Sequence, residues 1–362
     1  MKTLTLVLVV LLCCGAVAQA QEYDFYDLGT LGGSLSQAYA VNDAGQVVGW
    51  SMINSNPNQA QAFLWDTDSG LVNLGTAMGV SFSSAYGISE SGQIAGEAYF
   101  GGSAPHAFYW DGSSITNLQT LGGARSYAYG VNDAGQVVGK AQASSGDYQP
   151  FYWDTGLSGM QPLQNATGRA QAINNAGQVT GSFETAAGEA GGFDRAFVWD
   201  NTNGVQILQP SEAEKETFAQ AINGQGSIAG YSEAAGGQYQ AFLWDTIDQV
   251  RYDLGAGSQG FGLNDLNVVV GEFDTASGKH AFLHQGNGFI DLNTFLPDGS
   301  GWVLQSAQDI NNNGVIVGWG MVGGQTRAFV LAPKVVPEPL SMLLFVVGGG
   351  ALAASRKLRK RR

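Results

Sequence analysis

The sequence predicts an all-β protein, a seven-bladed β-propeller, and three observations support this fold class. The 362 residues include 53 glycines and 11% aromatic residues but only 13% charged ones, a composition typical of many short strands joined by tight turns. One segment recurs seven times along the chain, at intervals of about 45 residues. Each repeat is rich in β-branched and aromatic residues, and none shows the 3.6-residue periodicity of a helix.

The first part of each repeat predicts a β-hairpin followed by a closing glycine. In AYAVNDAGQVVG (38–49) and AYGVNDAGQVVG (128–139), Asn opens a tight turn through its side chain and Gly supplies a left-handed residue. Two antiparallel strands are therefore expected in every repeat. The closing glycines are Gly49, Gly96, Gly139, Gly181, Gly230, Gly271 and Gly318.

Two further strand candidates follow each hairpin. The third strand is an alternating Ala-Phe-x-Trp stretch, as in AFLWD (62–66), and we expect its Trp in the core. The fourth strand ends in Leu, as in LVNL (71–74), and is found in the first six repeats. Four strands in a unit of this length match a propeller blade better than a helical solenoid. A parallel β-helix is the competing fold, although its coils are normally shorter.

The ends of the repeat region predict how the ring closes. The seventh repeat ends at Ala332 without a fourth strand, whereas YDFYDLGTLGG (23–33) resembles a fourth strand ahead of the first hairpin. We therefore expect Tyr23–Leu28 to complete the blade that is otherwise built from 307–332. This arrangement hides the sheet edges that an open array of blades would expose.

The first 20 residues have the order of a secretory signal peptide. Lys2 precedes an apolar run, and small residues then lead to Ala18 and Ala20, after which cleavage is expected. A lipoprotein signal at Cys14 is the alternative, but Cys13 occupies the place where a small residue is needed. Both cysteines of the chain lie in this segment, so the exported protein is expected to fold without disulfides.

Residues 335–362 contain the features of a C-terminal membrane segment. Sixteen uncharged positions, 340–355, are followed by an end in which six of the last seven residues are Lys or Arg. As a helix, sixteen residues extend about 24 Å, less than the roughly 30 Å of a bilayer core, and the basic end is expected on the cytoplasmic side. A plain membrane anchor is the simpler interpretation of these features.

The residues before this segment favour a more specific interpretation. Pro337-Glu338-Pro339, a short apolar helix and a basic end, in that order, resemble the PEP-CTERM sorting signal of exopolysaccharide-producing Gram-negative bacteria. The resemblance implies an exosortase-type membrane protease as a partner, which processes the chain near Pro337, Glu338 and Pro339. It also implies export across the inner membrane, transient anchoring through the C-terminal helix, and delivery to the cell surface or extracellular matrix.

The repeats resemble a second family, that of the HAF extracellular repeats. His106-Ala107-Phe108 and His280-Ala281-Phe282 carry its signature intact. In the other repeats the His position is occupied by Gln61, Gln149, Arg195, Gln240 and Arg327. The resemblance covers 24–332 and implies an extracytoplasmic location, and it supplies no catalytic residues to carry over.

The charge of the repeat region restricts its partners. Lys2 lies in the signal segment, and 335–362 contain six basic residues and Glu338, so the body 21–334 keeps 9 basic and 29 acidic residues. The resulting formal charge of −20 argues against binding to nucleic-acid phosphates. A polysaccharide or divalent cations suit such a surface better.

The sequence predicts no catalytic, metal-binding or cofactor-binding residues. HExxH, GxSxG, P-loop and paired-Cys motifs are absent from it. His106 and His280 occupy equivalent repeat positions, which favours a structural role, and His284 replaces the Trp of its repeat. Most acids at repeat positions read as turn residues, such as Asp43 and Asp66. Calcium bound between turns remains an alternative to this interpretation.

We therefore expect a non-catalytic surface or matrix protein that binds exopolysaccharide or another surface ligand through propeller loops. The least repeat-like segments, 182–195 and 210–218, are the expected binding loops because propeller ligands commonly lie where strand connections converge. The alternative is a polysaccharide-acting enzyme that uses carboxylates at the mouth of the channel. A carboxylate cluster outside the repeat register would favour that enzyme.

Overall fold

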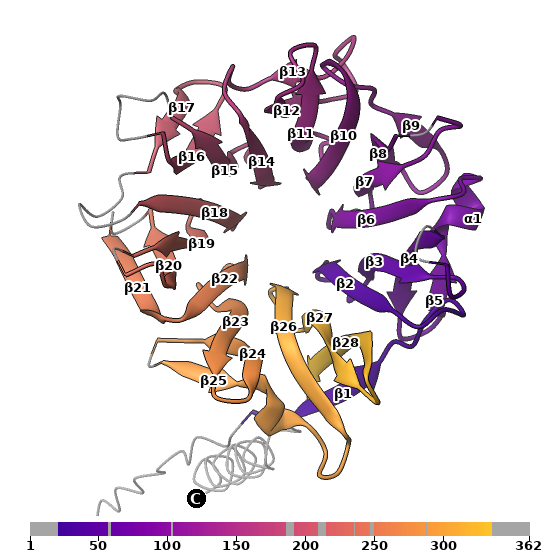
Figure 1. Cartoon of the computed structure of the whole chain (residues 1–362), viewed down its shortest axis with the longest axis vertical. Helices are drawn as coiled ribbons and strands as arrows, with labels where there is room; N and C mark the ends of the chain where they lie inside the picture. The colour runs from indigo at the N-terminus through magenta and orange to yellow at the C-terminus, as the bar shows by residue number, and fades with distance from the viewer. Residues whose placement is uncertain are drawn as a thin grey trace, which may run out of the picture. The chain divides into compact units, whose positions relative to one another are not determined.

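The computed structural model describes residues 21–56, 59–102, 104–185, 192–208, 215–234, 236–246, 250–286 and 288–334. In it, seven four-stranded antiparallel sheets surround a central axis (Figure 1). The ring belongs to a compact unit, Asp24–Ala332. This arrangement confirms the expected seven-bladed propeller, because each predicted repeat supplies one sheet.

Within each of the first six blades, the strands follow one another from the axis outward in chain order. The first three blades consist of β2 (Ser36–Val41), β3 (Val47–Met52), β4 (Ala60–Asp66) and β5 (Gly70–Asn73); β6 (Ser83–Ile88), β7 (Ile94–Ala98), β8 (His106–Trp110) and β9 (Ile115–Asn117); and β10 (Gly122–Val131), β11 (Val137–Ala143), β12 (Tyr148–Trp153) and β13 (Gln161–Pro162). Blades four to six consist of β14 (Gly168–Ile173), β15 (Val179–Glu184), β16 (Asp194–Asp200) and β17 (Gly204–Ile207); β18 (Glu216–Ile222), β19 (Ile228–Glu233), β20 (Tyr239–Asp245) and β21 (Val250–Ala256); and β22 (Ser258–Leu263), β23 (Val269–Thr275), β24 (Gly278–His284) and β25 (Phe289–Asp291).

The seventh blade combines the two ends of the propeller. Its sheet has the order β1-β28-β27-β26, with β1 (Tyr23–Asp27), β26 (Trp302–Ile310), β27 (Ile316–Val322) and β28 (Gln325–Pro333). The Leu28 amide donates to the Ala328 carbonyl at 3.1 Å, and Arg327 pairs with Asp27 at 3.1 Å. The predicted closure by the N-terminal strand is therefore confirmed, and it pairs an edge that the seventh repeat would leave open.

Two short helices lie in connections between blades, where the sequence predicted none. They are α1 (Leu74–Met78), which follows β5, and the 3₁₀-helix η1 (Leu292–Phe295), which follows β25. The side chain of Asn73 caps α1 by accepting from the Thr76 amide, and Asp291 caps η1 in the same way through Asn293. Both caps use the Asx side chain at the end of an outer strand.

The closing glycine is required by a bulge in the neighbouring inner strand. In the third blade, Ala128 pairs with Gly139 and Gly130 with Val138, which leaves Tyr129 as the extra residue of the bulge. A Cβ atom on Gly139 would lie 1.9 Å from the Tyr127 carbonyl oxygen and 2.8 Å from the Phe151 ring. No side chain fits there, and the other six closing glycines face the same contact with a carbonyl of the inner strand.

The core of each blade is centred on the Phe of Ala-Phe-x-Trp, which corrects part of the prediction for Trp. Trp65 and Trp153 are buried at 8% exposure, but the corresponding residues of the second, fourth and fifth blades are only half-buried. Trp65 and Trp153 pack on the preceding blade, against Tyr26 and Tyr109 respectively. The Phe side chains are at most 2% exposed, and they are Phe63, Phe108, Phe151, Phe197, Phe242, Phe282 and Phe329.

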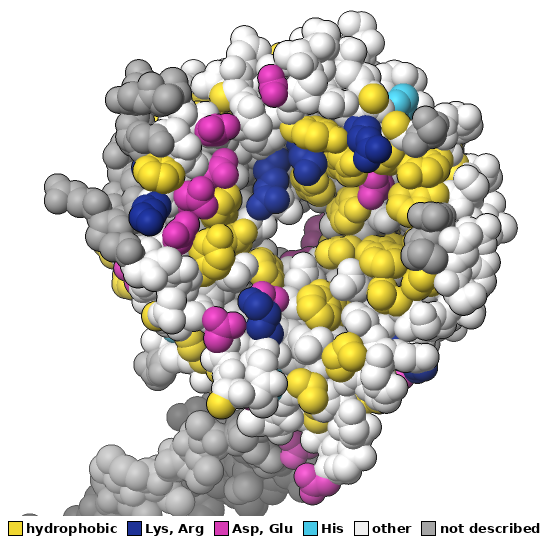
Figure 2. Space-filling view, in the orientation of Figure 1, with side chains coloured by type: hydrophobic (Ala, Val, Ile, Leu, Met, Phe, Trp, Pro, Cys, Tyr) yellow, Lys and Arg dark blue, Asp and Glu magenta, His cyan; other side chains and the backbone are white. Residues whose placement is uncertain are grey.

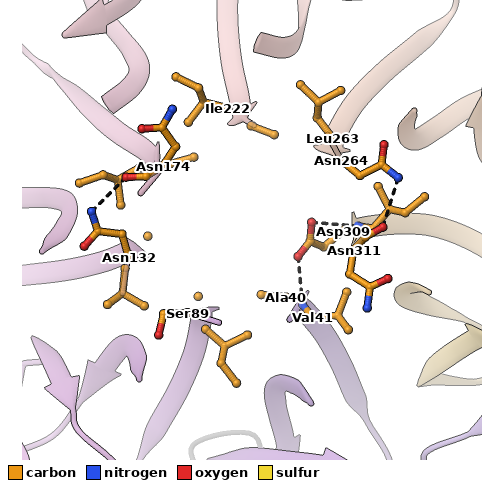
Figure 3. Close-up of a pocket in the computed structure, with 18 of the residues that line it drawn as sticks. Ala40, Val41, Ser89, Asn132, Asn174, Ile222, Leu263, Asn264, Asp309 and Asn311 are labelled. Atoms are coloured by element: carbon orange, nitrogen blue, oxygen red, sulfur yellow. Dashed lines mark hydrogen bonds between the residues drawn. The ribbon is translucent and has the colours of Figure 1, made fainter. Parts of the chain in front are cut away.

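The Asn of each hairpin turn also joins neighbouring blades. The Oδ1 atom of Asn132 accepts from the Gln136 amide and so caps its own turn, while Nδ2 donates to the Asn174 carbonyl of the next blade at 3.0 Å. Figure 3 shows these Asn side chains around the axis. Six of the seven blades make this contact, and the second blade has Ser89 instead of Asn.

The chain ends contribute little to the described structure. In the unit formed by the two ends of the chain, the Lys334 amide donates a hydrogen bond to the Glu22 carbonyl at 2.8 Å. The predicted signal peptide, with Ala18 and Ala20, and the predicted sorting segment, with Pro337, Glu338 and Pro339, lie outside the described residues. No helix in the described ranges has the length and apolar character needed to span a bilayer.

Candidate functional site

The inner strands surround a channel of about 440 Å³ along the propeller axis. The ends of the inner strands and the turns that follow them contribute to the wall, as β2 does through Tyr39, Ala40 and Val41 and its turn does through Asp43. Because every inner strand runs in the same direction along the axis, equivalent residues form rings at the same depth (Figure 3). The two mouths of the channel therefore differ in chemistry: one has the Tyr39 positions, and the other has the hairpin turns.

Tyrosine side chains gather at the first mouth, on the first three blades. Tyr39 and Tyr86 contact each other with ring centroids 5.3 Å apart, and Tyr86 contacts Tyr129 at 5.6 Å. Tyr127 lies parallel to Tyr129 at 6.5 Å and contacts Tyr148 at 6.0 Å. We call these five residues the tyrosine mouth. Inner strands supply four of the rings, and β12 supplies Tyr148.

Lys140 lies beside three of these five rings. It is paired with Tyr127 across β10 and β11, and its Nζ atom is 5.0, 5.8 and 5.1 Å from the ring centroids of Tyr127, Tyr129 and Tyr148. These distances are within the range of cation–π attraction. Figure 2 shows Lys and Arg side chains beside the channel opening, among hydrophobic side chains. Burial and the nearby Arg169 guanidinium lower the pKa of Lys140, while Glu97 acts in the opposite direction.

A buried carboxyl group completes the mouth. Glu97 is 7% exposed and accepts a 2.7 Å hydrogen bond from the Tyr86 hydroxyl. Burial raises the pKa of Glu97, against the Tyr86 hydrogen bond and the positive charges of Lys140 and Arg125. Burial also raises the pKa of Tyr86 well above its usual range and that of Tyr127 to about 12. The hydroxyls therefore stay protonated at neutral pH and can act as donors.

The arrangement places apolar aromatic faces beside hydroxyl and ammonium groups that can donate hydrogen bonds. Neither the tyrosines nor Lys140 was a predicted site residue. In the sequence the tyrosines look like ordinary strand aromatics, and only the packing of neighbouring blades brings Tyr39 close to Tyr86.

The hairpin mouth carries acids that are part of the fold. The Asp43 carboxylate accepts from the Asn312 amide at 2.8 Å, and the Ser91 amide donates to Asp133 at the same distance. Asp265 accepts from Gly224 in the same manner. These contacts cross from blade to blade in the repeat register. No three of the His, Asp and Glu side chains described in the structure are grouped as metal ligands would be.

The acids that follow the third strand also act as turn residues, as the sequence predicted. Asp66, Asp111, Asp154 and Asp200 each accept a hydrogen bond from the backbone amide two residues later. Hydrogen bonds from the residues three positions later, Ser69, Ser114 and Asn203, are the largest causes that lower the pKa of Asp66, Asp111 and Asp200, and the amides two positions later add to them. The carboxylates are therefore held by their own turns, which explains their repetition.

Asp309 is a carboxyl group that sequence reasoning missed. It occupies the position of Ala40 in the seventh blade, where the other inner strands have only Ala or Gly. Its Oδ2 atom accepts from the Val41 amide of the first blade at 3.0 Å, and Oδ1 accepts from Ile310 at 2.9 Å (Figure 3). Burial raises the pKa of Asp309 to about 7. The replacement of a small residue in one repeat is the signal that could have identified it.

The histidines hold strands together inside single blades. His106 Nδ1 lies 3.2 Å from Asn117 Oδ1, and His280 Nδ1 lies 2.7 Å from Asp291 Oδ2, so both contacts join the third strand to the fourth. This agrees with the structural role predicted for the pair. His284 is half-buried beside Phe289, and burial lowers its pKa. The predicted binding loops are described only at 182–185, 192–195 and 215–218.

The seven four-stranded sheets around one axis define a β-propeller. The β-propeller domain of the Trilobed protease from Pyrococcus furiosus, described as having an open velcro topology, matches with a TM-score of 0.53 at 9% identity, over 83% of this chain and 95% of that one. A puromycin-hydrolyzing peptidase from Mycobacterium tuberculosis matches with a TM-score of 0.52 at 12% identity, over 87% of this chain and 55% of that one. These likenesses support the fold alone.

Other comparisons add less. TolB from Acinetobacter baumannii matches with a TM-score of 0.46 at 15% identity. The match covers 86% of this chain and 66% of the TolB chain. A family model described as a protein of unknown function, DUF3466, matches residues 73–211. No curated protein matches the sequence.

Proposed function

We propose that the protein is an exported, non-catalytic surface or matrix protein that binds exopolysaccharide at the tyrosine mouth. The observation that carries the proposal is the contact chain of five tyrosines around Lys140 at one end of the channel. A core would bury such rings completely, but Tyr39, Tyr86, Tyr127, Tyr129 and Tyr148 are all partly exposed. Exposed aromatic rings beside donors are the usual means of binding sugars.

The proposed site differs from the one expected from the sequence. The sequence favoured the irregular connections 182–195 and 210–218, whereas the aromatic group lies on the first three blades. Both ideas use the side of the propeller at which the inner strands begin. The proposal therefore keeps the expected ligand class and moves its contacts to inner strands.

The enzymatic alternative has less support from the arrangement of acids. Asp43, Asp133 and Asp265 lie in the repeat register and accept backbone hydrogen bonds between blades. Asp309 lies outside the register, but backbone amides hold both of its oxygens. A glycosidase needs one carboxyl group free to donate a proton and another free to attack or to activate water.

Export and sorting form the second part of the proposal. The signal segment, the HAF-like repeats and the Pro337-Glu338-Pro339 motif support secretion by a Gram-negative cell and processing by an exosortase-type protease. Changing Pro337, Glu338 and Pro339 to Ala should leave unprocessed protein in the inner membrane, since a protease must read the motif. Intact-mass analysis of the surface protein checks this expectation. A mass that still includes residues 340–362 would rule out processing, and a plain membrane anchor would then be the explanation.

A glycan array with the purified protein, run beside a hydrolysis assay on the same glycans, tests the binding function. We expect binding without hydrolysis, and its loss in a Tyr127→Ala/Tyr148→Ala double variant that still unfolds cooperatively. Tyr252→Ala is the control, because Tyr252 is 45% exposed on the outer strand β21. Hydrolysis of a bound glycan, or unchanged binding by the double variant, would contradict the proposal.

A further inference from the structure

The basic residues of the propeller differ in whether they have an acidic partner. Acids outnumber bases by 29 to 9 in the body, so a base finds a carboxylate easily. Arg251 pairs with Asp253, Lys279 with Glu272, and Arg327 with Asp27. By contrast, Arg125, Lys140 and Arg169 form no ion pair with any residue that the structure describes.

These three bases lie together at the tyrosine mouth. Arg125 extends from β10, two residues before Tyr127, while Arg169 extends from β14 at the repeat position that Tyr127 holds in the third blade. Lys140 extends from β11 over the rings of Tyr127 and Tyr148. Figure 2 shows dark-blue side chains concentrated beside the opening in this part of the face.

The arrangement is unfavourable without an added negative charge. Arg169 lies close enough to Lys140 to disfavour its ammonium form, and burial acts in the same direction. Of the acids nearby, Glu97 is buried and already accepts from Tyr86, and Asp194, which acts on Arg169, is itself half-buried. A half-buried cation beside other cations costs free energy that an anion at the same place would recover.

We propose that the tyrosine mouth selects an acidic polysaccharide, one whose sugar rings carry carboxylates, and that Lys140 and Arg169 bind that carboxylate. The tyrosine faces pack against the ring while the two bases supply the missing counter-charges, as charge-assisted hydrogen bonds do. The inference rests on the proposed function and adds the substrate class. The body carries a formal charge of −20, but salt screens its distant acids. The attraction between these bases and a bound carboxylate acts at short range, so the protein can still accept an anion.

Isothermal titration calorimetry of the purified protein with a galacturonate hexasaccharide and with its carboxyl-reduced, neutral counterpart tests the inference. We expect the acidic oligosaccharide to bind at least about tenfold more tightly, the size of one charge-assisted hydrogen bond. Lys140→Met removes the ammonium and keeps an apolar stem over the rings, so it should weaken this preference, and a Lys140→Met/Arg169→Met double variant should abolish it. Lys279→Met is the matched control, because it removes one positive charge from another blade.

The outcomes separate this inference from the proposed function. Equal affinity of the wild-type protein for both oligosaccharides would overturn the charge selection and leave polysaccharide binding intact. An undiminished preference in Lys140→Met would overturn the role of Lys140. Absence of binding to either oligosaccharide, together with a negative glycan array, would remove the proposed function as well. Dextran sulfate binding as tightly as the uronate would indicate general anion attraction and would also contradict the inference.

Discussion

Asp309 shows how one substitution in a repeat changes the energetics of the ring. The position lies against the next blade, where Ala or Gly fits, and at the closure between the seventh and first blades it holds a carboxyl group. Two backbone amides donate to this carboxyl group, but they do not offset its burial, because its pKa is raised to about 7. The Glu90 and Asp43 carboxylates act in the same direction.

This raised pKa predicts a pH dependence with a definite sign. In the unfolded chain Asp309 loses its proton near its ordinary value of 3.8, whereas in the folded protein it keeps the proton up to about pH 7. The folded state therefore binds more protons between these values, and stability falls as pH rises from about 4 to 7. Above that range the full cost of the buried charge, on the order of a few kcal/mol, is present.

Urea denaturation at pH 5 and pH 8 checks the prediction. The wild-type protein should lose more stability between the two pH values than Asp309→Asn, which keeps one oxygen acceptor and cannot ionise. Comparing the two proteins cancels the titration of other groups, such as Glu97. Parallel pH profiles for both proteins would show that Asp309 does not carry the raised pKa.

At the scale of the strand pair, the hairpin turn predicts a measurable link between blades. Asn132 donates to the Asn174 carbonyl, whereas Ser89 caps its own turn through Gln93 and is too short to bridge to the third blade. Asn132→Ser should therefore lower the free energy of unfolding by about 1 kcal/mol, the net value of one hydrogen bond. Ser89→Asn should add the missing contact and raise stability by a similar amount.

Thermal and urea unfolding of the two single variants measure these changes. The reciprocal pair serves as its own control, because both variants keep a side chain that caps the turn. Equal destabilisation by both variants would mean that each turn is adapted to its own residue. The hydrogen bond to the next blade would then contribute nothing to the free energy of unfolding.

The elements were largely predictable from the sequence, and the reasons are local. Asn-x-x-Gly turns, β-branched stretches and the closing glycines occur at fixed spacing, so each hairpin could be located from its own residues. The core was less predictable, because Phe63 and Trp65 alternate on one strand and only packing decides which is covered. Both lie in the core cluster shared with the seventh blade, where Phe63 is completely covered, whereas Trp65 keeps 8% exposure and contacts Tyr26.

At the scale of the whole molecule, the ring depends on one strand from the other end of the chain. Strand β1 completes the sheet of β26, β27 and β28, and the Asp27–Arg327 pair and the Leu28–Ala328 hydrogen bond join the two ends. Deleting residues 21–31 should lower the melting temperature by more than its length suggests, because it exposes the edge of β28.

Differential scanning calorimetry of the deletion variant checks the closure. The expected result is a clearly lower and less cooperative transition than that of the full protein. An unchanged melting temperature would show that the seventh blade is stable with three strands and that β1 is not needed for closure.

The binding site was the part that the sequence could not predict. Tyr39, Tyr86 and Tyr129 are about 45 residues apart, and each reads as an ordinary strand aromatic in its own repeat. Their contacts exist only because seven blades place equivalent positions around one axis. The packing of the third blade on the fourth likewise brings Lys140 and Arg169 together, although they belong to different repeats. The sequence predicted binding by the loops 182–195 and 210–218 instead, because their departure from the repeat is visible without a structure.

Hydrogen–deuterium exchange with and without the galacturonate hexasaccharide tests the central claim, that ligand binds at the tyrosine mouth, most directly. The account predicts slower exchange in the peptides that cover the middle of β10, the middle of β11 and the start of β12, where Tyr127, Lys140 and Tyr148 lie. The hairpin turns at the opposite mouth, such as 132–136, should exchange at the same rate in both samples. Protection of those turns, with none around Lys140, would contradict the account.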